Sequence, residues 1–154
     1  MAAGSFTLYN NAKLLIANNG VDLDGDTFKA MMTTSSYTPS VSGNTVKTDV
    51  TNEITDSDYS EQTLGSVTVG ESGGTVTFDS ADINFGSSVT ISNAKYLVIY
   101  SDTHASDALL CYVDLDTSAA SGVSSTNSQF QVTINANGIF TLTQEILCLV
   151  IQTR

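Results

Sequence analysis

Short runs in which apolar and polar residues alternate recur along this chain, and they constrain its fold more than any other feature. Thr27–Thr33 and Leu109–Asp116 both alternate in this way. Period-two alternation over a short run is typical of a β-strand with one buried face. The run Lys95–Tyr100 is apolar at almost every position. We therefore expect it to be a central strand that is covered on both faces.

The remaining apolar runs predict further short strands joined by turns. Glu71-Ser72-Gly73-Gly74 has the composition of a hairpin turn, and Asn135-Ala136-Asn137-Gly138 that of a tight turn. The one helix signal is Ala12–Ala17, preceded by two asparagines that could cap it and followed by Asn18-Asn19-Gly20. The other strands are expected at Leu64–Val69, Thr75–Asp79, Asp82–Phe85, a segment with Phe130, Val132 and Ile134 facing inward, Ile139–Leu142 and Ile146–Gln152.

These elements predict one all-β domain over residues 1–154, because a chain of 154 residues is of single-domain size. We expect an antiparallel β-sandwich or a partly closed barrel of about eight strands, with one short N-terminal helix. Two polar segments, Thr33–Asn44 and Thr117–Ser128, are expected to be loops. Met1–Asn11 is expected to be an N-terminal contact arm, free to reach a neighbouring subunit.

The charge balance excludes several classes of partner. The chain has 16 Asp and Glu against 5 Lys and Arg, a formal net charge of −11. Nucleic acids and anionic membranes are bound by clusters of Lys and Arg, so neither is an expected partner. No signal peptide is expected at the N-terminus, and no apolar run is long enough to span a membrane. We expect a soluble protein made in a reducing cytoplasm.

Few side chains suit catalysis, so we expect the protein not to be an enzyme. The single histidine, His104, lies in a polar loop with Ser106 and Asp107, whereas a catalytic triad is assembled from distant segments. Cys111 and Cys148 each lie inside an apolar run and are interpreted as buried thiols, although a disulfide between adjacent strands stays open.

The candidate metal ligands are Asp22, Asp24 and Asp26, whose alternating carboxylates could converge on a hard cation such as calcium. An acidic turn before a strand is the alternative, since the glycine and glutamate of an EF-hand loop are missing here. Two further carboxylate pairs, Asp79 with Asp82 and Asp114 with Asp116, lie near strand ends. Without tryptophan or a signature of a cleft, they are weak candidates for glycosidase chemistry. No cofactor is expected.

The order of several motifs resembles that of small tailed-phage virion proteins. The stretch Leu23–Ser35 is similar to a DTDTFKVxLxTS opening of that family, and Val76–Ile83 is similar to its AxFDADDV stretch. Tyr96–Thr103, followed by Leu109–Asp114, resembles the AVIYxDT…LIAYxDF core, and Asn135–Leu142 resembles the last hairpin. The chain departs from the family at Ser57–Gln62, which lacks the glycines of a Gly-Tyr-Thr-x-Gly-Gly loop.

The resemblance implies a structural part of a phage particle. The first hypothesis is a capsid decoration (cement) protein whose partners are the major capsid protein and further copies of itself, located in the virion after assembly in the host cytoplasm. The second is a tail or head–tail connector component. A third, from a different class, is a carbohydrate- or receptor-binding module. In each case the apolar strand Ile146–Gln152 must be covered, either by the core or by a partner subunit.

Overall fold

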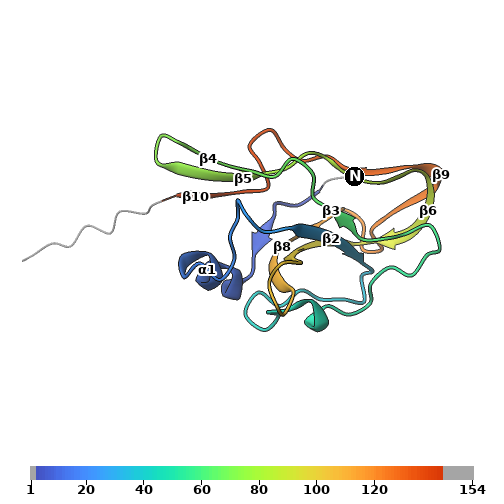
Figure 1. The fold of residues 1–154 in the computed structure, drawn as a ribbon. Helices are drawn as coiled ribbons and strands as arrows, with labels where there is room; N and C mark the ends of the chain where they lie inside the picture. Colours follow the sequence, from blue (N-terminus) through green and yellow to red (C-terminus); the bar gives the residue numbers. More distant parts are fainter. Residues whose placement is uncertain (1–2, 144–154) are drawn as a thin grey trace, which may run out of the picture.

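The computed structural model describes residues 3–143, and its strands form two packed layers (Figure 1). The prediction of an all-β fold with one short helix is confirmed, and the described sheets are antiparallel and do not close into a barrel. The elements in chain order are β1 (Thr7–Leu8), α1 (Asn10–Ala17), β2 (Phe28–Thr33), the 3-10 turn η1 (Lys47–Asp49), β3 (Gln62–Thr63), β4 (Thr68–Ser72), β5 (Thr75–Asp79), β6 (Ile83–Ala94), β7 (Tyr96–Ser101), β8 (Ala108–Asp114), β9 (Val123–Val132) and β10 (Phe140–Thr143).

The first layer is a five-stranded antiparallel sheet in the order β1-β8-β7-β2-β3. The strand β7 is at its centre, and five of its six residues are buried, which confirms the prediction from its doubly apolar sequence. Pairing of Met32 with Leu97 and of Leu97 with Val113 fixes the face that points toward the second layer. After Ile99 the pairing of β7 with β8 shifts, so that β8 has one more residue than β7 at this point.

The second layer combines the three-stranded sheet β10-β5-β4 with the two-stranded ribbon β6-β9. Aromatic side chains join the two layers: the Phe78 ring meets Phe28 edge-on at 5.2 Å and stacks on Phe140 at 5.1 Å. The predicted hairpin between β4 and β5 is present, with Gly73 and Gly74 at φ of 61° and 82°. Both values suit the tight turns in which glycine is preferred.

The opposite face of the five-stranded sheet is covered by α1 and by the irregular segment 34–61. Tyr9 packs on Tyr112 at 5.4 Å, and Tyr37 packs on Tyr96 at 6.1 Å. The hydroxyls of Tyr9 and Tyr37 are 2.9 Å apart and form a buried hydrogen bond. This cover explains why β7 is apolar on both faces, and it shows that the predicted loop Thr33–Asn44 carries a residue of the core.

The helix α1 begins one residue after Tyr9 and ends as the sequence predicts. The asparagines expected to cap it belong instead to its first turn, and Tyr9 makes no side-chain capping bond. At the other end, Asn19 adopts φ of 60°, Gly20 N donates to Leu15 O, and Asn19 N donates to Ile16 O. These bonds form a Schellman motif with asparagine in the left-handed position.

Three predictions about the later strands were wrong in extent or in partner. The strand predicted at Asp82–Phe85 continues to Ala94, and β9 begins at Val123, inside the segment Thr117–Ser128 that was expected to be a loop. Four register shifts interrupt the β6-β9 pairing, so strict alternation is lost in the sequence. The strand β10 pairs with β5 and not with the preceding strand β9.

The structure also differs from the expected N-terminal arm. Gly4 N donates to Asp114 O at 2.8 Å, and Thr7–Leu8 pairs with β8. Residues 4–9 therefore lie along an edge of the chain's own sheet, because β8 offers them unpaired backbone groups. The predicted strand Ile146–Gln152, with Cys148, lies outside the described residues.

Candidate functional site

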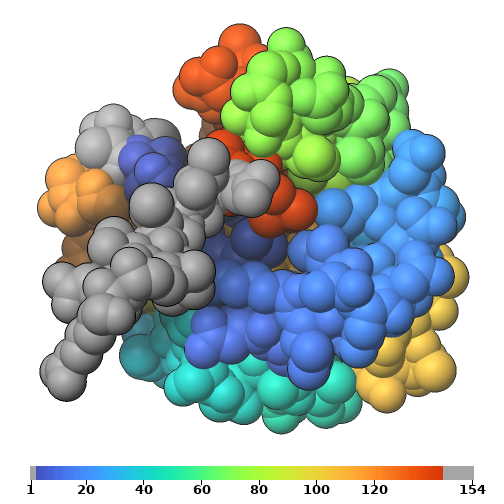
Figure 2. Space-filling model, turned by 90° about the vertical axis from the view of Figure 1, so that its left-hand side faces the viewer, coloured from blue at the N-terminus to red at the C-terminus, as the bar shows by residue number. Residues whose placement is uncertain are grey.

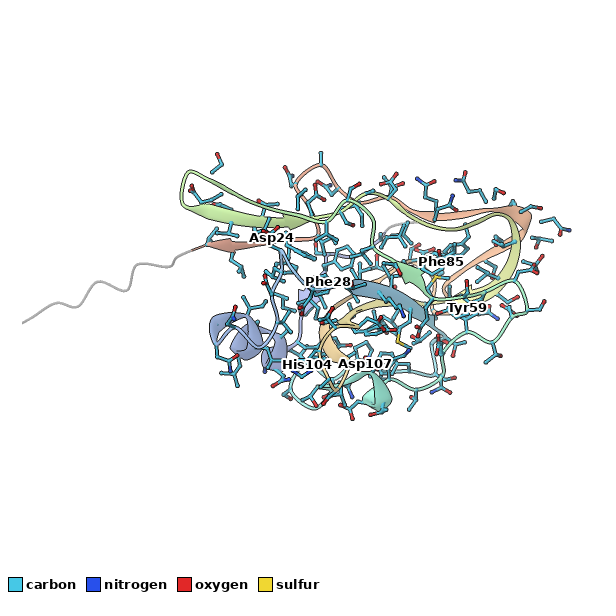
Figure 3. The ribbon with its side chains drawn as sticks, in the orientation of Figure 1. Asp24, Phe28, Tyr59, Phe85, His104 and Asp107 are labelled. Carbon is cyan, nitrogen blue, oxygen red and sulfur yellow. The ribbon has the colours of Figure 1, made fainter. Side chains whose placement is uncertain are left out.

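The loop that carries His104 does not assemble a catalytic triad. Ser101 Oγ donates to Asp26 Oδ2 at 2.8 Å, but it accepts from the backbone nitrogen of His104 and not from the imidazole. His104 Nδ1 instead accepts from the backbone of Ser106 at 3.3 Å. His104 and Asp107 lie together in this loop, apart from Asp24 (Figure 3). Within residues 3–143, no hydrogen bond joins a serine hydroxyl to the His104 imidazole.

The carboxylates of Asp22, Asp24 and Asp26 do not converge on one point. Asp22 Oδ1 accepts from the backbone nitrogens of Asp24 and Gly25, both at 3.1 Å, while Asp26 points toward Ser101. These hydrogen bonds are those of an Asx-type turn before β2. Within residues 3–143, no group of three His, Cys, Asp or Glu side chains could hold a metal ion.

The other two carboxylate pairs also accept hydrogen bonds from their own chain. Asp114 accepts from Asp116 N and Asp116 accepts from Ser118 N, both at 3.0 Å. Asp82 accepts from Ile134 N at 2.9 Å and from Gln131 Nε2 at 2.6 Å, and Asp79 accepts from Ser80 N at 2.8 Å. The Asp82 contacts join the start of β6 to the end of β9, and the Asp79 contact lies in the turn between β5 and β6. The carboxyl groups therefore stabilise strand ends and do not face each other across a cleft.

Lys95 is the buried cation that sequence reasoning missed. Its ammonium donates to Asp114 Oδ1 at 2.8 Å, to the carbonyl of Asp116 at 2.8 Å and to that of Ala119 at 2.9 Å. All three donors of the ammonium are therefore used, as burial of a charge requires. The sequence contained a signal, since a lysine directly before a fully apolar strand needs a partner at that strand's end. The partner could not be found without the β7-β8 register.

A second polar cluster, also missed from sequence, joins the irregular segment to the sheet. Lys47 Nζ lies 2.7 Å from Glu61 Oε1 and 3.0 Å from Tyr100 Oη, and Tyr100 donates to Glu61 Oε2 at 2.7 Å. Next to it, Tyr59 Oη donates to Glu53 Oε1 and accepts from the backbone of Met32 on β2, both at 2.9 Å. We call these five side chains, Lys47, Glu53, Tyr59, Glu61 and Tyr100, the Lys47 cluster.

The protonation states in the Lys47 cluster suit a structural role better than proton transfer. Burial lowers the pKa of Lys47, but its bonds to Glu61 and Tyr100 outweigh this and raise the pKa well above its ordinary value. Burial, together with the bond to Glu61, raises the pKa of Tyr100. At neutral pH the lysine is thus charged and the tyrosine neutral, whereas a general base or nucleophile would need the reverse.

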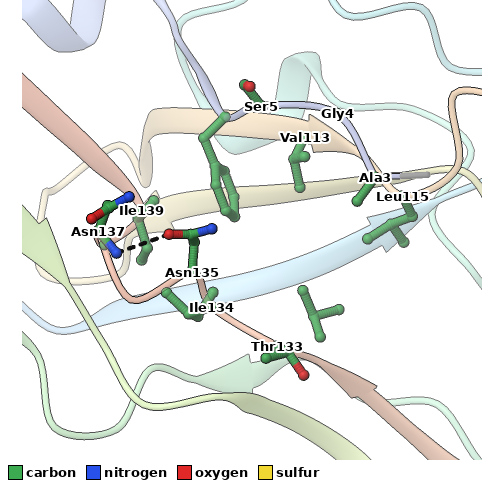
Figure 4. Close-up of a pocket in the computed structure, with 13 residues that line it drawn as sticks. Ala3, Gly4, Ser5, Val113, Leu115, Thr133, Ile134, Asn135, Asn137 and Ile139 are labelled. Atoms are coloured by element: carbon green, nitrogen blue, oxygen red, sulfur yellow. Dashed lines mark hydrogen bonds between the residues drawn. The ribbon is translucent and has the colours of Figure 1, made fainter.

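A cavity lies between the layers, where the N-terminal segment passes the turn that follows β9 (Figure 4). Its volume is about 500 Å³, and Val113, Leu115, Ile134 and Ile139 form its apolar walls. Thr133, Asn135 and Asn137 are at its rim. None of the described residues that line it has an ionisable side chain. This cavity can hold apolar groups, but its described walls supply no acid, base or charged ligand.

Burial makes the thiol of the one described cysteine, Cys111, unreactive. Cys111 is a free thiol, fully buried in β8, and burial raises its pKa far above the ordinary value. The prediction of a buried thiol is confirmed for this residue. For Cys148 the prediction of a buried thiol is not tested, because this residue lies outside the described residues.

Comparison with known proteins gave no relative. No family model, no curated protein and no solved structure matches this chain. No described helix has the length and apolar character needed to cross a membrane.

Proposed function

We propose that the chain is a structural protein of a tailed-phage particle, and that it decorates the outer face of the head by binding the major capsid protein. The observation that carries this proposal is the division of the molecule into an acidic surface and a cavity with no ionisable described wall. A molecule of this kind can bind a partner protein whose surface has a complementary shape and the opposite charge. The ordered motifs between Leu23 and Leu142 that resemble virion proteins support the same function.

The charge distribution supports a basic partner surface. Lys29, Lys47 and Lys95 each form an ion pair with a carboxylate of the same chain. Much of the small positive charge is thereby neutralised internally, and acidic groups such as Asp24, Asp58 and Glu71 remain exposed. Many identical weak contacts on a regular lattice would then add up to stable attachment.

Localisation on phage particles tests the proposal. Particles from an infected culture are purified and labelled with antibodies against this chain, and its copy number is measured against the major capsid protein. Labelling over the head, with many copies per particle, is expected. Labelling confined to the tail, with few copies, would make it a tail or connector component. Particles without the protein would overturn both structural roles.

Salt dependence tests the proposed charge complementarity. Binding of the purified chain to heads that lack it is measured by co-sedimentation at about 50 and 500 mM NaCl. Affinity should fall at least tenfold at the higher salt, because exposed charges are screened. Affinity that is unchanged would contradict an acidic surface docking on a basic one.

A further inference from the structure

The strand β10 lies at an edge of the three-stranded sheet. β10 pairs with β5 on one side only. Its last residue, Thr143, lies opposite Thr75, which is the first residue of β5 after the Gly73-Gly74 turn. Residues that continue β10 beyond Thr143 therefore have no further residue of β5 to pair with. Figure 1 shows that this end of the three-stranded sheet projects from the molecule.

The segment that follows is too apolar to be left in water. Residues 146–151 read Ile-Leu-Cys-Leu-Val-Ile, six apolar residues in succession with high β-propensity. An uncovered segment of this composition pairs with other chains and aggregates. Something must cover it in a stable molecule.

A tight return onto the same chain is disfavoured by the residues available for the turn. Where the described chain reverses direction sharply, glycine or asparagine supplies a positive φ, as at Gly73, Gly74, Gly138 and Asn19. The two residues between Thr143 and Ile146 are Gln144 and Glu145. Neither readily adopts the positive φ that two-residue hairpin turns need.

The apolar cavity lies at the other end of β10. Ile139, one of its walls, directly precedes Phe140, the first residue of β10, whereas the apolar segment departs after Thr143. The surface view shows β10 in red beside the green β4-β5 hairpin and above the blue helix α1 (Figure 2). A segment that enters the cavity from a second copy needs no reversal at Gln144-Glu145. Six extended residues span ~20 Å, enough to follow the free edge of β10 into the cavity.

We propose that the apolar segment 146–151 of one copy docks on a second copy, along the free edge of β10 and with apolar side chains in the cavity between Ile134, Ile139 and Val113. The strand adds backbone hydrogen bonds, and the cavity takes alternate side chains. If each copy docks its own segment on a neighbour and binds the segment of a neighbour, the copies form a closed assembly. The proposal does not rest on the role in a phage particle, since it concerns only copies of this chain.

Truncation tests the role of the segment. The full chain and a chain that ends at Thr143 are compared by sedimentation equilibrium, with L149D as a full-length variant and circular dichroism as a check of folding. The full chain should have a mass of two or more copies, and both variants should have the mass of one. Association of the full chain should strengthen with NaCl, because two copies of charge −11 repel each other. Equal assembly of all three proteins would overturn the proposal.

Cysteine cross-linking tests whether the segment reaches another copy. One chain carries T133C at the cavity rim with C111S and C148S, and a second, size-tagged chain carries C111S and keeps Cys148. Mild oxidation of the mixture should give a covalent heterodimer. The matched control replaces T133C in the first chain with S57C, at an exposed residue that does not line the cavity, and should give at least tenfold less product.

The alternative arrangement, in which the segment folds back onto its own chain, predicts a different disulfide-linked product. In a single chain that carries both T133C and Cys148, with C111S, docking on a second copy gives covalent dimers or larger species. A segment that folds back gives a disulfide within one chain, with the mass of a monomer. That result, with no heterodimer in the mixture, would overturn the proposal. It would leave the proposed attachment to phage heads untouched.

Discussion

At the residue scale, the buried ammonium of Lys95 is held by a complete set of partners. Lys95 is 7% exposed and makes three bonds, to one carboxylate and two carbonyls. A buried cation is tolerated only when its donors are satisfied, and removal of one partner leaves the others unpaired. Lys95 therefore ties the end of β8 and the following turn to β7.

Replacing Lys95 with methionine should lower the free energy of unfolding by about 3–5 kcal/mol, because Asp114 and two carbonyls lose their donor. The measurement is urea unfolding followed by circular dichroism. The matched control is Lys13→Met on the exposed face of α1, which should change the free energy by about 0.5 kcal/mol or less. A cost below about 1 kcal/mol for K95M would show that the three bonds contribute little.

Asp49 provides a pH-dependent contribution at the turn η1. Hydrogen bonds from the backbone nitrogens of Thr45 and Val46, at 2.7 and 3.1 Å, lower the pKa of its carboxyl group below the ordinary value of 3.8. The folded-state pKa is lower than the unfolded one, so the stabilisation is complete above about pH 4. It disappears as the pH falls through the folded-state pKa.

Asp49→Asn should therefore cost about 1 kcal/mol at pH 7, where the charged acceptor is lost. The difference from the natural protein should shrink steadily as unfolding is measured at pH 4, 3 and 2. Asp24→Asn serves as the control, because no hydrogen bond to its carboxylate is found among the described contacts. A difference that stays constant down to pH 2 would contradict a role for the carboxylate charge.

At the element scale, the long ribbon β6-β9 depends on side chains from a distant segment. Asp56 Oδ2 accepts from Ser92 N at 2.7 Å, and Asp58 Oδ2 accepts from Thr90 N at 2.8 Å. Register shifts in the ribbon leave backbone donors of β6 unpaired by β9 at these positions. The two aspartates satisfy these donors, and so they attach the segment before β3 to the ribbon.

The double substitution Asp56→Ala and Asp58→Ala should loosen this part of β6 without unfolding the protein. Amide hydrogen exchange of Thr90 and Ser92 should accelerate at least tenfold, whereas amides of the central strand β7 should exchange as before. NMR-detected exchange at neutral pH measures both sets in one sample. Unchanged protection at Thr90 and Ser92 would mean that other groups hold these amides.

At the scale of the whole molecule, aromatic contacts join the two layers. The Phe78 ring is fully buried between Phe28 of the first layer and Phe140 of the second. Because the Phe78 side chain is fully buried, its removal would leave a cavity that its neighbours can fill only partly.

Phe78→Ala should lower the free energy of unfolding by about 3–5 kcal/mol, measured by urea unfolding. The control is Leu14→Ala on α1, whose side chain is 60% exposed and which should cost about 0.5 kcal/mol or less. If F78A cost no more than L14A, the packing of Phe78 would not hold the layers together.

The sequence by itself determined the elements that depend on local pattern. Alternation and doubly apolar runs predicted β2, β7 and β8, and glycine or asparagine at the turns predicted the β4-β5 hairpin and the end of α1, because these signals act within a few residues. The resemblance to virion proteins, and the function drawn from it, stay predictions.

Only the tertiary structure decided what depends on residues far apart in the chain. It extended β6 and β9 through polar, bulged segments, paired β10 with β5 and laid residues 4–9 on β8. It also brought Lys95 to Asp114 and gathered the Lys47 cluster. These arrangements follow from sheet order and register, which are set by burial over the whole molecule and leave no signal in any single segment.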